Sequence, residues 1–241
     1  MEGLKLWAKK NPNLTSLITF ILFFVAIGWL LSYQWLLAFI VCVSLAVHEY
    51  SHVMAMKMKG IPVKAVIFIP LLGAVAIGGG KRVWTKKEEC FIAAAGPVMG
   101  YLSALPVWLL FVMTSNPIFA KAVLYIVVIN LFNMLPLSPL DGGRIVKSIL
   151  MSTSLKNRMI GFVIWGVLAV GAVLVLFQIK VSLFILLVII FFAYQEFAGE
   201  WEQYKLKLDF GFPLSMNARL GFGLLYAVLA GWPFVLYYLL K

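Results

Sequence analysis

Long apolar runs follow one another along almost the whole sequence, and this feature limits the chain to folds that lipid surrounds. Hydrophobic residues make up 63% of the chain and charged residues only 12%, whereas a typical soluble domain has about 45–50% apolar and about 25% charged residues. A water-soluble fold of 241 residues cannot bury so much apolar surface. The sequence therefore predicts an integral membrane protein, in contact with the lipid bilayer and without a separate soluble domain.

About 20 apolar residues are needed for a helix to cross the hydrocarbon core of a bilayer, and the sequence offers about six to seven such segments. The candidates are Leu14–Leu31, Trp35–Met56, Cys90–Met113, Pro117–Leu135, Met159–Phe177, Val181–Phe197 and Leu220–Leu240. The first is longer than the apolar part of a signal peptide and lacks a small-residue cleavage site, so we expect a retained span. The fold class predicted is an α-helical polytopic membrane protein, with residues 1–241 as a single membrane-embedded domain.

The basic residues divide unevenly between the two sides of such a protein. The formal charge is +11, from 20 Lys and Arg against nine Asp and Glu. If the N-terminus is inside the cell, all basic residues except Lys121, Lys180 and Lys241 fall in cytoplasmic segments, as the positive-inside rule requires. We therefore expect a multi-pass protein with a cytoplasmic N-terminus. The charge excess is explained by this topology, and no nucleic-acid partner is expected.

The segment Ile61–Gly80 interrupts the helical pattern. It is apolar, but it contains two prolines and four glycines, and these residues break helices. Between them, residues 63–68 and 74–77 have the composition of two short strands. Both flanks are basic, so the segment would enter and leave on the cytoplasmic face. Non-helical backbone at membrane depth is tolerated only beside protein or a water-filled cavity. We therefore expect a re-entrant β-hairpin at a polar site, with a surface loop as the alternative.

The two histidines of the chain lie four residues apart, in His48-Glu49-Tyr50-Ser51-His52. At this spacing two side chains share one face of a helix, so both imidazoles can bind one zinc ion. Glu49 cannot bind the same ion from that face, but it can activate a water molecule as a general base. Two satisfied core histidines are the alternative. A chance match to this motif is on the order of one in several thousand, which favours the metal site.

A catalytic zinc ion usually has three protein ligands, and the chain has no third histidine. The acidic residues near apolar runs are Glu88, Glu89, Asp141, Glu196 and Glu200. Asp141 follows an apolar span in a segment with two prolines and two glycines, which predicts a fixed non-helical turn. Spacing alone favours equally a second interpretation, in which Asp141 is the N-cap of a helix over Ile145–Met151.

Two motifs about ninety residues apart resemble those of the site-2 protease family of intramembrane zinc metalloproteases. They are the His48–His52 motif and Asn133-x-x-Pro136-x-x-Pro139-Leu140-Asp141-Gly142-Gly143. A third similarity is Glu89-x-x-Ile92-Ala93-x-Ala95-Gly96-Pro97. The resemblance covers roughly residues 35–155, the family's catalytic core. It implies one zinc ion per chain, bound by His48, His52 and Asp141. It also implies that Glu49 is the general base and that Asn133 stabilises the oxyanion or holds the substrate backbone.

The resemblance implies a substrate class as well. Proteases of this family hydrolyse peptide bonds in or near transmembrane segments of other membrane proteins, in regulated intramembrane proteolysis. The hairpin would position a locally unwound substrate segment, since an α-helix shields its peptide bonds. The residues expected to contact substrate are Ile67, Phe68, Gly73, Ala74 and Val75. Both histidines lie near the cytoplasmic end of their predicted span, so we expect the active site to open on that side.

The sequence also departs from the family. Many relatives have an asparagine shortly after the Gly96-Pro97 pair, where this chain has Gly100, so we assign this region no catalytic role. We expect no inserted PDZ domain and no CBS pair. A zinc-binding transporter is one alternative function, but it predicts paired charges in several spans and inverted repeats, which the sequence lacks. An inactive protease-like membrane partner is another, but a structural zinc site has no use for Glu49.

Overall fold

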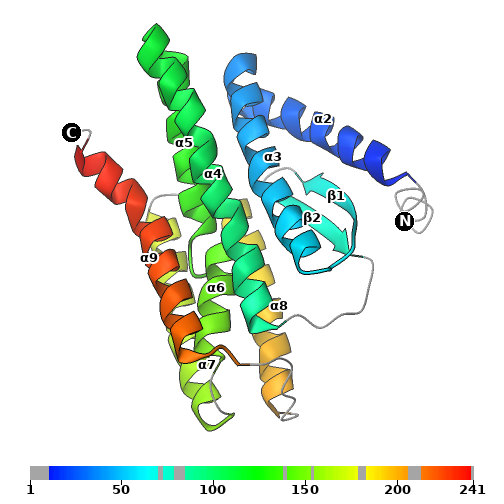
Figure 1. The fold of residues 1–241 in the computed structure, drawn as a ribbon, viewed down its shortest axis with the longest axis vertical. Helices are drawn as coiled ribbons and strands as arrows, with labels where there is room; N and C mark the ends of the chain where they lie inside the picture. Colours follow the sequence, from blue (N-terminus) through cyan, green and yellow to red (C-terminus); the bar gives the residue numbers. More distant parts are fainter. Residues whose placement is uncertain are drawn as a thin grey trace. The chain divides into compact units, whose positions relative to one another are not determined.

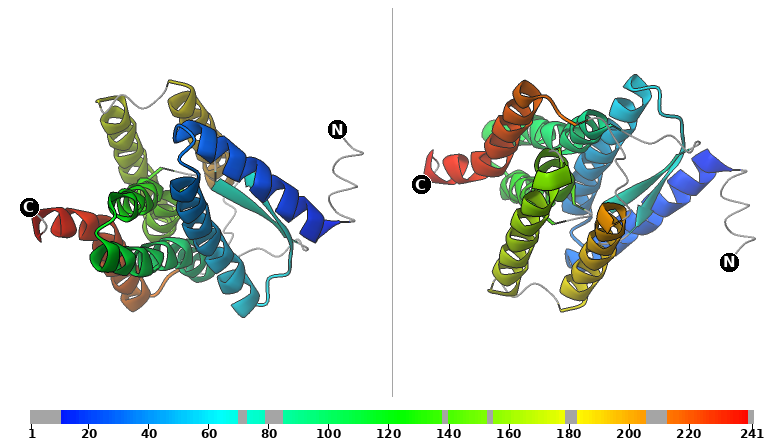
Figure 2. Two further views of the ribbon diagram at one scale, coloured as in Figure 1. Left: turned by 90° about the horizontal axis from the view of Figure 1, so that it is seen from above. Right: turned by 90° about the horizontal axis from the view of Figure 1, so that it is seen from below.

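The computed structural model describes residues 11–69, 73–78, 85–137, 140–152, 155–178, 183–205 and 213–239. These segments contain eight helices and two short strands (Figures 1 and 2). Their bounds are α2 Pro12–Leu30, α3 Trp35–Met58, β1 Val63–Ile69, β2 Gly73–Gly78, α4 Lys86–Thr114, α5 Pro117–Asn133, α6 Asp141–Leu150, α7 Leu155–Gln178, α8 Leu183–Lys205 and α9 Met216–Leu239.

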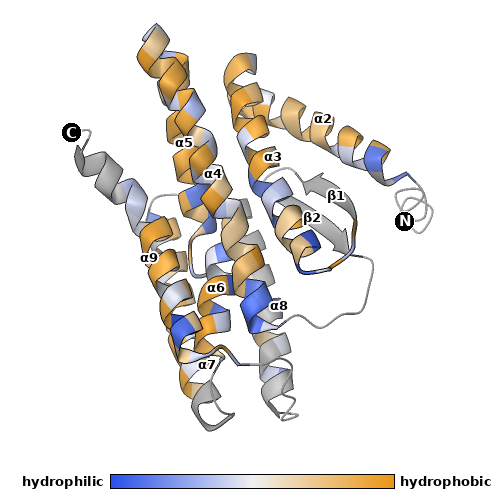
Figure 3. Ribbon diagram, viewed as in Figure 1, coloured by the Kyte–Doolittle hydropathy of each residue, from blue (hydrophilic) through white to orange (hydrophobic). Residues whose placement is uncertain are grey.

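Within the described residues, four helices are long and apolar enough to cross a membrane, judged by length and composition. They are α2, α3, α4 and α7, while α5 is apolar but shorter. Figure 3 shows apolar residues along most of α2 and the N-terminal half of α3, whereas the polar residues of α3 gather in its C-terminal half. The helical membrane fold is thus confirmed, and the described helices support four spans where the sequence predicted about six to seven.

The contacts along the chain define two compact units. The first unit comprises Met1–Arg82 and Val98–Val128, and the second comprises Val83–Pro97 and Ile129–Lys241. Each unit has its own packed elements, which are α2, α3 and the two strands in the first, and α6 with α7 and α9 in the second.

The first unit contains the predicted hairpin. Strands β1 and β2 pair antiparallel in a two-stranded sheet, with Val66 opposite Ala76 and Phe68 opposite Ala74. Helix α3 leads into the hairpin through a turn at Gly60, whose φ of 68° is one that glycine adopts without strain. In this turn Gly60 N–H donates to Lys57 O and Ile61 N–H donates to Met56 O, both at 2.9 Å, which is the Schellman pattern. The prediction of two strands in this segment is therefore confirmed.

Helices α2 and α3 flank the hairpin in the first unit (Figures 1 and 2). The Phe24 ring of α2 lies 5.7 Å from the Trp35 ring of α3, measured between centroids. Gly28 leaves space for the same Trp35 ring, because a Cβ at this position would overlap it. Aromatic packing of this kind stabilises the contact between α2 and α3.

The second unit is built around the short helix α6, which contacts both α7 and α9. Val146 of α6 and Met151, which directly follows α6, pack with Phe162 and Trp165 of α7 in a buried cluster. The N-terminal turn of α4 also belongs to this unit and begins with a capping box. Thr85 Oγ1 accepts a hydrogen bond from Glu88 N–H at 3.2 Å, and Glu88 Oε2 accepts one from Thr85 N–H at 3.0 Å. Glu88 therefore stabilises the start of a helix.

Candidate metal centre

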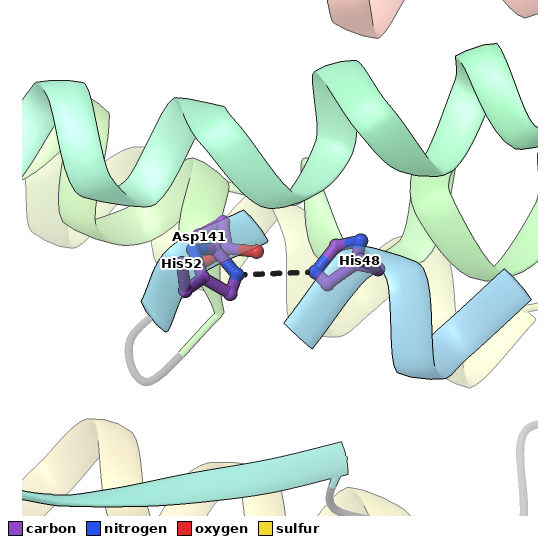
Figure 4. Close-up of side chains that lie close together, drawn as sticks. All are labelled: His48, His52 and Asp141. Atoms are coloured by element: carbon purple, nitrogen blue, oxygen red, sulfur yellow. Dashed lines mark hydrogen bonds between the residues drawn. The ribbon is translucent and has the colours of Figure 1, made fainter. Parts of the chain in front are cut away.

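His48 and His52 lie one turn apart on α3, as their spacing predicts. Both are buried, with 1% and 9% of their surface exposed. Their Nε2 atoms are 3.2 Å apart (Figure 4), and the ring planes are inclined by 77° with centroids 5.0 Å apart. The helix thus turns one nitrogen of each ring toward the same point.

The distance between the two nitrogens can be compared with what a zinc ion requires. Tetrahedral zinc binds imidazole nitrogens at about 2.0–2.1 Å, so two such nitrogens lie about 3.3–3.4 Å apart. The observed 3.2 Å agrees with this value. Burying two imidazoles in an apolar helix is costly unless their nitrogens have partners, and a shared metal ion supplies a partner to both. The histidine pair therefore fits a zinc ion.

Glu49 is half-buried on α3, directly after His48. The hydroxyl of Ser51 donates to Val47 O at 2.6 Å, so this side chain is used within the helix. A hydroxyl that bonds to its own helix does not compete for a metal. The potential metal ligands on this face of α3 are therefore the two imidazoles.

Asp141 is the first residue of α6, and this corrects the sequence-based prediction in two respects. The helix begins at Asp141, four residues before the predicted Ile145, so Gly142 and Gly143 are helical and do not form a turn. The N-cap is Leu140, and no side chain caps the helix. The N-cap interpretation of Asp141 is therefore wrong. Its carboxylate lies at the positive end of the helix dipole, where a negative charge is stabilised.

Asp141 is 6% exposed, and the chemistry of its carboxylate suits a metal. One donor atom from each of His48, His52 and Asp141 lies within 4.8 Å of the others, and Figure 4 draws these three side chains. Two imidazole nitrogens and one carboxylate oxygen form a common ligand set of catalytic zinc sites. The residues present therefore fit a zinc ion.

Gly142 is required by packing. A Cβ at this position would overlap the carbonyl group of Met134 and would lie 2.7 Å from the carbonyl oxygen of Leu135. The same Met134 carbonyl accepts a hydrogen bond of 2.8 Å from the Tyr226 hydroxyl of α9. The turn between α5 and α6 is therefore held from two sides, by α6 and by α9.

Arg144 lies one turn after Asp141 on α6 and connects two acidic residues. Its Nε donates to Glu89 Oε1 of α4 at 3.0 Å, and its Nη1 lies 3.5 Å from Asp141 Oδ1. Neither Arg144 nor Glu89 was assigned a role from the sequence, although both lie in or beside the motifs. Their opposite charges were the only indication in the sequence of an ion pair. Because they are 55 residues apart, the sequence alone could not predict that they pair.

The structure also places the remaining predicted residues. Asn133 is the last residue of α5 and is half-buried, directly before the turn that Tyr226 holds. Asn130, one turn before Asn133, is 2% exposed. Asn130 and Asn133 lie on the same face of α5, since residues three apart in a helix are neighbours. The five residues predicted to contact substrate lie on the hairpin, with Ile67 and Phe68 on β1 and Gly73, Ala74 and Val75 on β2 opposite them.

Comparison with known proteins identifies a family for the segment that carries the histidine pair. Residues 36–125 match the model of peptidase family M50. The predicted family resemblance is confirmed. A zinc metalloprotease of Methanocaldococcus jannaschii, MJ0392, is 30% identical in an alignment of 190 positions that covers 70% of this chain and 54% of that protein. Rip3 of Mycobacterium tuberculosis, assigned by name to the zinc metalloproteases, is 33% identical in an alignment of 129 positions that covers 48% of this chain and 32% of that protein.

The chain thus spans about half the length of the relative from Methanocaldococcus jannaschii, and a smaller share of the mycobacterial one. The M50 match includes α3 and the hairpin, and it ends within α5, before Asn133 and Asp141.

Proposed function

We propose that this protein is an intramembrane zinc metalloprotease that hydrolyses peptide bonds in or near transmembrane segments of membrane-protein substrates. The observation that carries the proposal is the pair of buried imidazoles, with Nε2 atoms 3.2 Å apart, beside Glu49. The helix that holds them is apolar enough to cross a membrane. Ionisable groups within such a helix are costly and mark functional sites.

His48, His52 and Asp141 would hold the zinc ion, one per chain. When bound, zinc polarises a carbonyl group and lowers the pKa of a coordinated water to about 7. The ion would therefore supply the electrophilic chemistry that peptide hydrolysis needs near neutral pH. The other steps fall to side chains of the protein.

Glu49 would act as the general base. It follows His48 directly on α3, and the helix face that carries the two imidazoles does not include it. It would accept a proton from the attacking water and then donate this proton to the amine that leaves when the peptide bond breaks. Asn133 would donate an amide hydrogen to the negative charge that develops on the carbonyl oxygen, or to the substrate backbone.

The hairpin would hold the substrate in extended form. A transmembrane helix must unwind locally before its peptide bond is accessible, and its freed backbone groups then need partners. Among the described residues β1 and β2 pair only with each other, so each strand has a second edge at which an extended segment can pair. Ile67, Phe68, Gly73, Ala74 and Val75 would line this position. The hairpin packs against α3, the helix of the histidine pair.

The orientation proposed from the basic residues places the start of α4 on the cytoplasmic side, with the N-terminus and the active-site opening. Lys87 in the first turn of α4 and Lys121 in α5 are both exposed, whereas Cys42 and Cys90 are buried. Lys87→Cys should therefore react with a membrane-impermeant thiol reagent only in inverted vesicles, and Lys121→Cys only in right-side-out vesicles. Labelling of both from one side would contradict the topology and the re-entrant hairpin.

The test of the proposed function is Glu49→Gln, with Tyr50→Phe as the matched neighbour. Gln keeps the size of Glu but cannot take a proton, so hydrolysis should fall by about 10²–10⁴. Membrane proteomics of cells expressing the wild type, Tyr50→Phe or Glu49→Gln would measure this. The first two should yield the same cleaved fragments, and Glu49→Gln should accumulate uncleaved membrane proteins while retaining its zinc. Identical fragments from all three would exclude a hydrolytic role for this residue.

A further inference from the structure

Arg144 connects the proposed ligand Asp141 to a second carboxylate on α4. We propose that Arg144, anchored by Glu89, is a positioning residue that orients the Asp141 carboxylate for metal binding. The inference rests on the proposed function, in which Asp141 is a metal ligand. It assigns to Glu89 and Arg144 a role toward the metal that no motif gave them.

The two contacts of Arg144 differ in strength. The bond from Nε to Glu89 Oε1 is 3.0 Å, within the range of a good charge-assisted hydrogen bond. The contact from Nη1 to Asp141 Oδ1 is 3.5 Å, at the long end of what counts as a hydrogen bond. Glu89 therefore sets where the guanidinium lies, and the guanidinium in turn constrains the Oδ1 side of Asp141.

Burial makes this chain of contacts more than a surface ion pair. The side chains of Arg144 and Glu89 are 22% and 23% exposed, and that of Asp141 is 8% exposed. Exposed pairs contribute little, because water screens them. Here most of each side chain is removed from solvent, so the contact restricts the direction of the carboxylate.

The helix dipole and Arg144 act differently on the Asp141 carboxylate. Asp141 begins α6, so the N-terminal end of the helix already stabilises its negative charge. What Arg144 adds is direction, since contact at Oδ1 turns Oδ2 toward a different partner. A metal ion bound at Oδ2 is compatible with this contact.

Arginine suits this role better than lysine. Its planar guanidinium presents N–H groups in several fixed directions, so Nε and Nη1 can contact two carboxylates at once. Lysine carries a single ammonium group on a flexible stem and would hold one carboxylate or the other. Hydrogen-bonded partners of metal ligands typically change metal affinity or activity by about 10–100-fold when removed.

The competing explanation is that the ion pair only ties α4 to α6. Both explanations predict a loss of thermal stability on mutation, so stability alone cannot separate them. Measurements of metal binding can separate them. A positioning role predicts weaker zinc binding and an altered absorption spectrum when Co²⁺ replaces zinc, whereas a purely structural tie predicts neither in protein that remains folded.

The experiment compares Arg144→Gln, Arg144→Lys and Glu89→Gln in the full-length purified protein. Lys87→Gln and Glu88→Gln are matched controls, since each removes a single charge from the first turn of α4. Zinc affinity is measured by competition with a chelator, and the Co²⁺ spectrum and the melting temperature without metal are recorded. Arg144→Gln should weaken zinc binding about 10–100-fold and shift the Co²⁺ bands.

The other variants complete the test. Arg144→Lys and Glu89→Gln should fall between the wild type and Arg144→Gln, and the double variant Glu89→Gln/Arg144→Gln should be no weaker than Arg144→Gln alone. Zinc affinity of both Arg144 variants equal to that of Lys87→Gln, with an unchanged Co²⁺ spectrum, would overturn the proposal. Wild-type protein that binds no zinc, or Asp141→Ala that binds it fully, would instead contradict the proposed ligand set itself.

Discussion

His48 and His52 are spaced by one turn of a single helix, whereas Asp141 depends on contacts with three other segments. The histidine nitrogens lie 3.2 Å apart because residues four apart share a helix face. At Asp141, by contrast, Glu89 anchors Arg144, Gly142 packs against the Met134 carbonyl, and Tyr226 bonds to the same carbonyl. The histidine half of the proposed metal site is thus determined locally, whereas the Asp141 half is held only by tertiary packing.

The histidine pair and Asp141 should therefore respond differently to substitutions of neighbouring residues. A substitution beside the histidines alters one helix turn, and the pair survives if the helix does. A substitution around Asp141 acts through neighbours on α4, in the turn after α5 and on α9, so residues far from this proposed ligand in sequence affect it. Substitutions in the two halves can therefore test this difference, and the largest effects on zinc binding are expected at the proposed ligands.

Removing a ligand from either half should abolish metal binding. His52→Ala and Asp141→Ala are each expected to weaken zinc binding by well over about 100-fold, because even an outer partner of a ligand contributes about 10–100-fold. Elemental analysis of purified protein measures the zinc content. Ser51→Ala is the control, since the Ser51 hydroxyl bonds to Val47 O within the helix. Zinc retained by Asp141→Ala would show that the third ligand lies elsewhere.

Asn133→Ala tests the tertiary half without touching a ligand. Loss of its amide should slow cleavage by about 10²–10³, as removal of an oxyanion donor typically does, and leave zinc bound. Cleavage rate and zinc content are measured on the same preparation. Asn217→Ala, an exposed amide at the start of α9, should match the wild type in both. If Asn133→Ala cleaves normally, Asn133 has no part in the reaction.

Gly142→Ala tests whether packing at α6 is as close as the structure indicates. The added methyl group would overlap the Met134 carbonyl, so the backbone must shift, at a cost of about 1–3 kcal/mol. Gly171→Ala on α7 is the control, because nothing lies within 4 Å of its new Cβ. Alanine there should be neutral or stabilising by about 0.5–1 kcal/mol. Melting temperatures in detergent measure both, and equal shifts would contradict the close approach.

Tyr226→Phe should have the smallest effect. It removes one hydrogen bond, the 2.8 Å bond from the hydroxyl to Met134 O, which typically contributes about 0.5–1.5 kcal/mol. A modest fall in melting temperature is expected with zinc content unchanged. Tyr194→Phe is the control, since this side chain is 67% exposed. A Tyr226→Phe protein as stable as Tyr194→Phe would show that α9 does not hold the turn.

The parts of the fold that were predicted well depend on local patterns. Prolines, glycines and β-branched residues predicted strands over residues 63–68 and 74–77, and the structure places them at Val63–Ile69 and Gly73–Gly78. The start of α6 was predicted wrongly because glycine is a poor helix former. Gly142 and Gly143 nevertheless lie in a helix, where the neighbouring Met134 carbonyl leaves no space for a side chain at position 142.

By itself, the sequence determined the apolar helical character of the protein, the hairpin and the spacing of His48 and His52. Each follows from residues close together in the chain, whose composition and periodicity fix local geometry. Only the tertiary structure decided that Asp141 begins a helix and that Arg144 links it to Glu89, 55 residues away. The physical reason is that such contacts depend on how distant segments pack, and no local pattern encodes that packing.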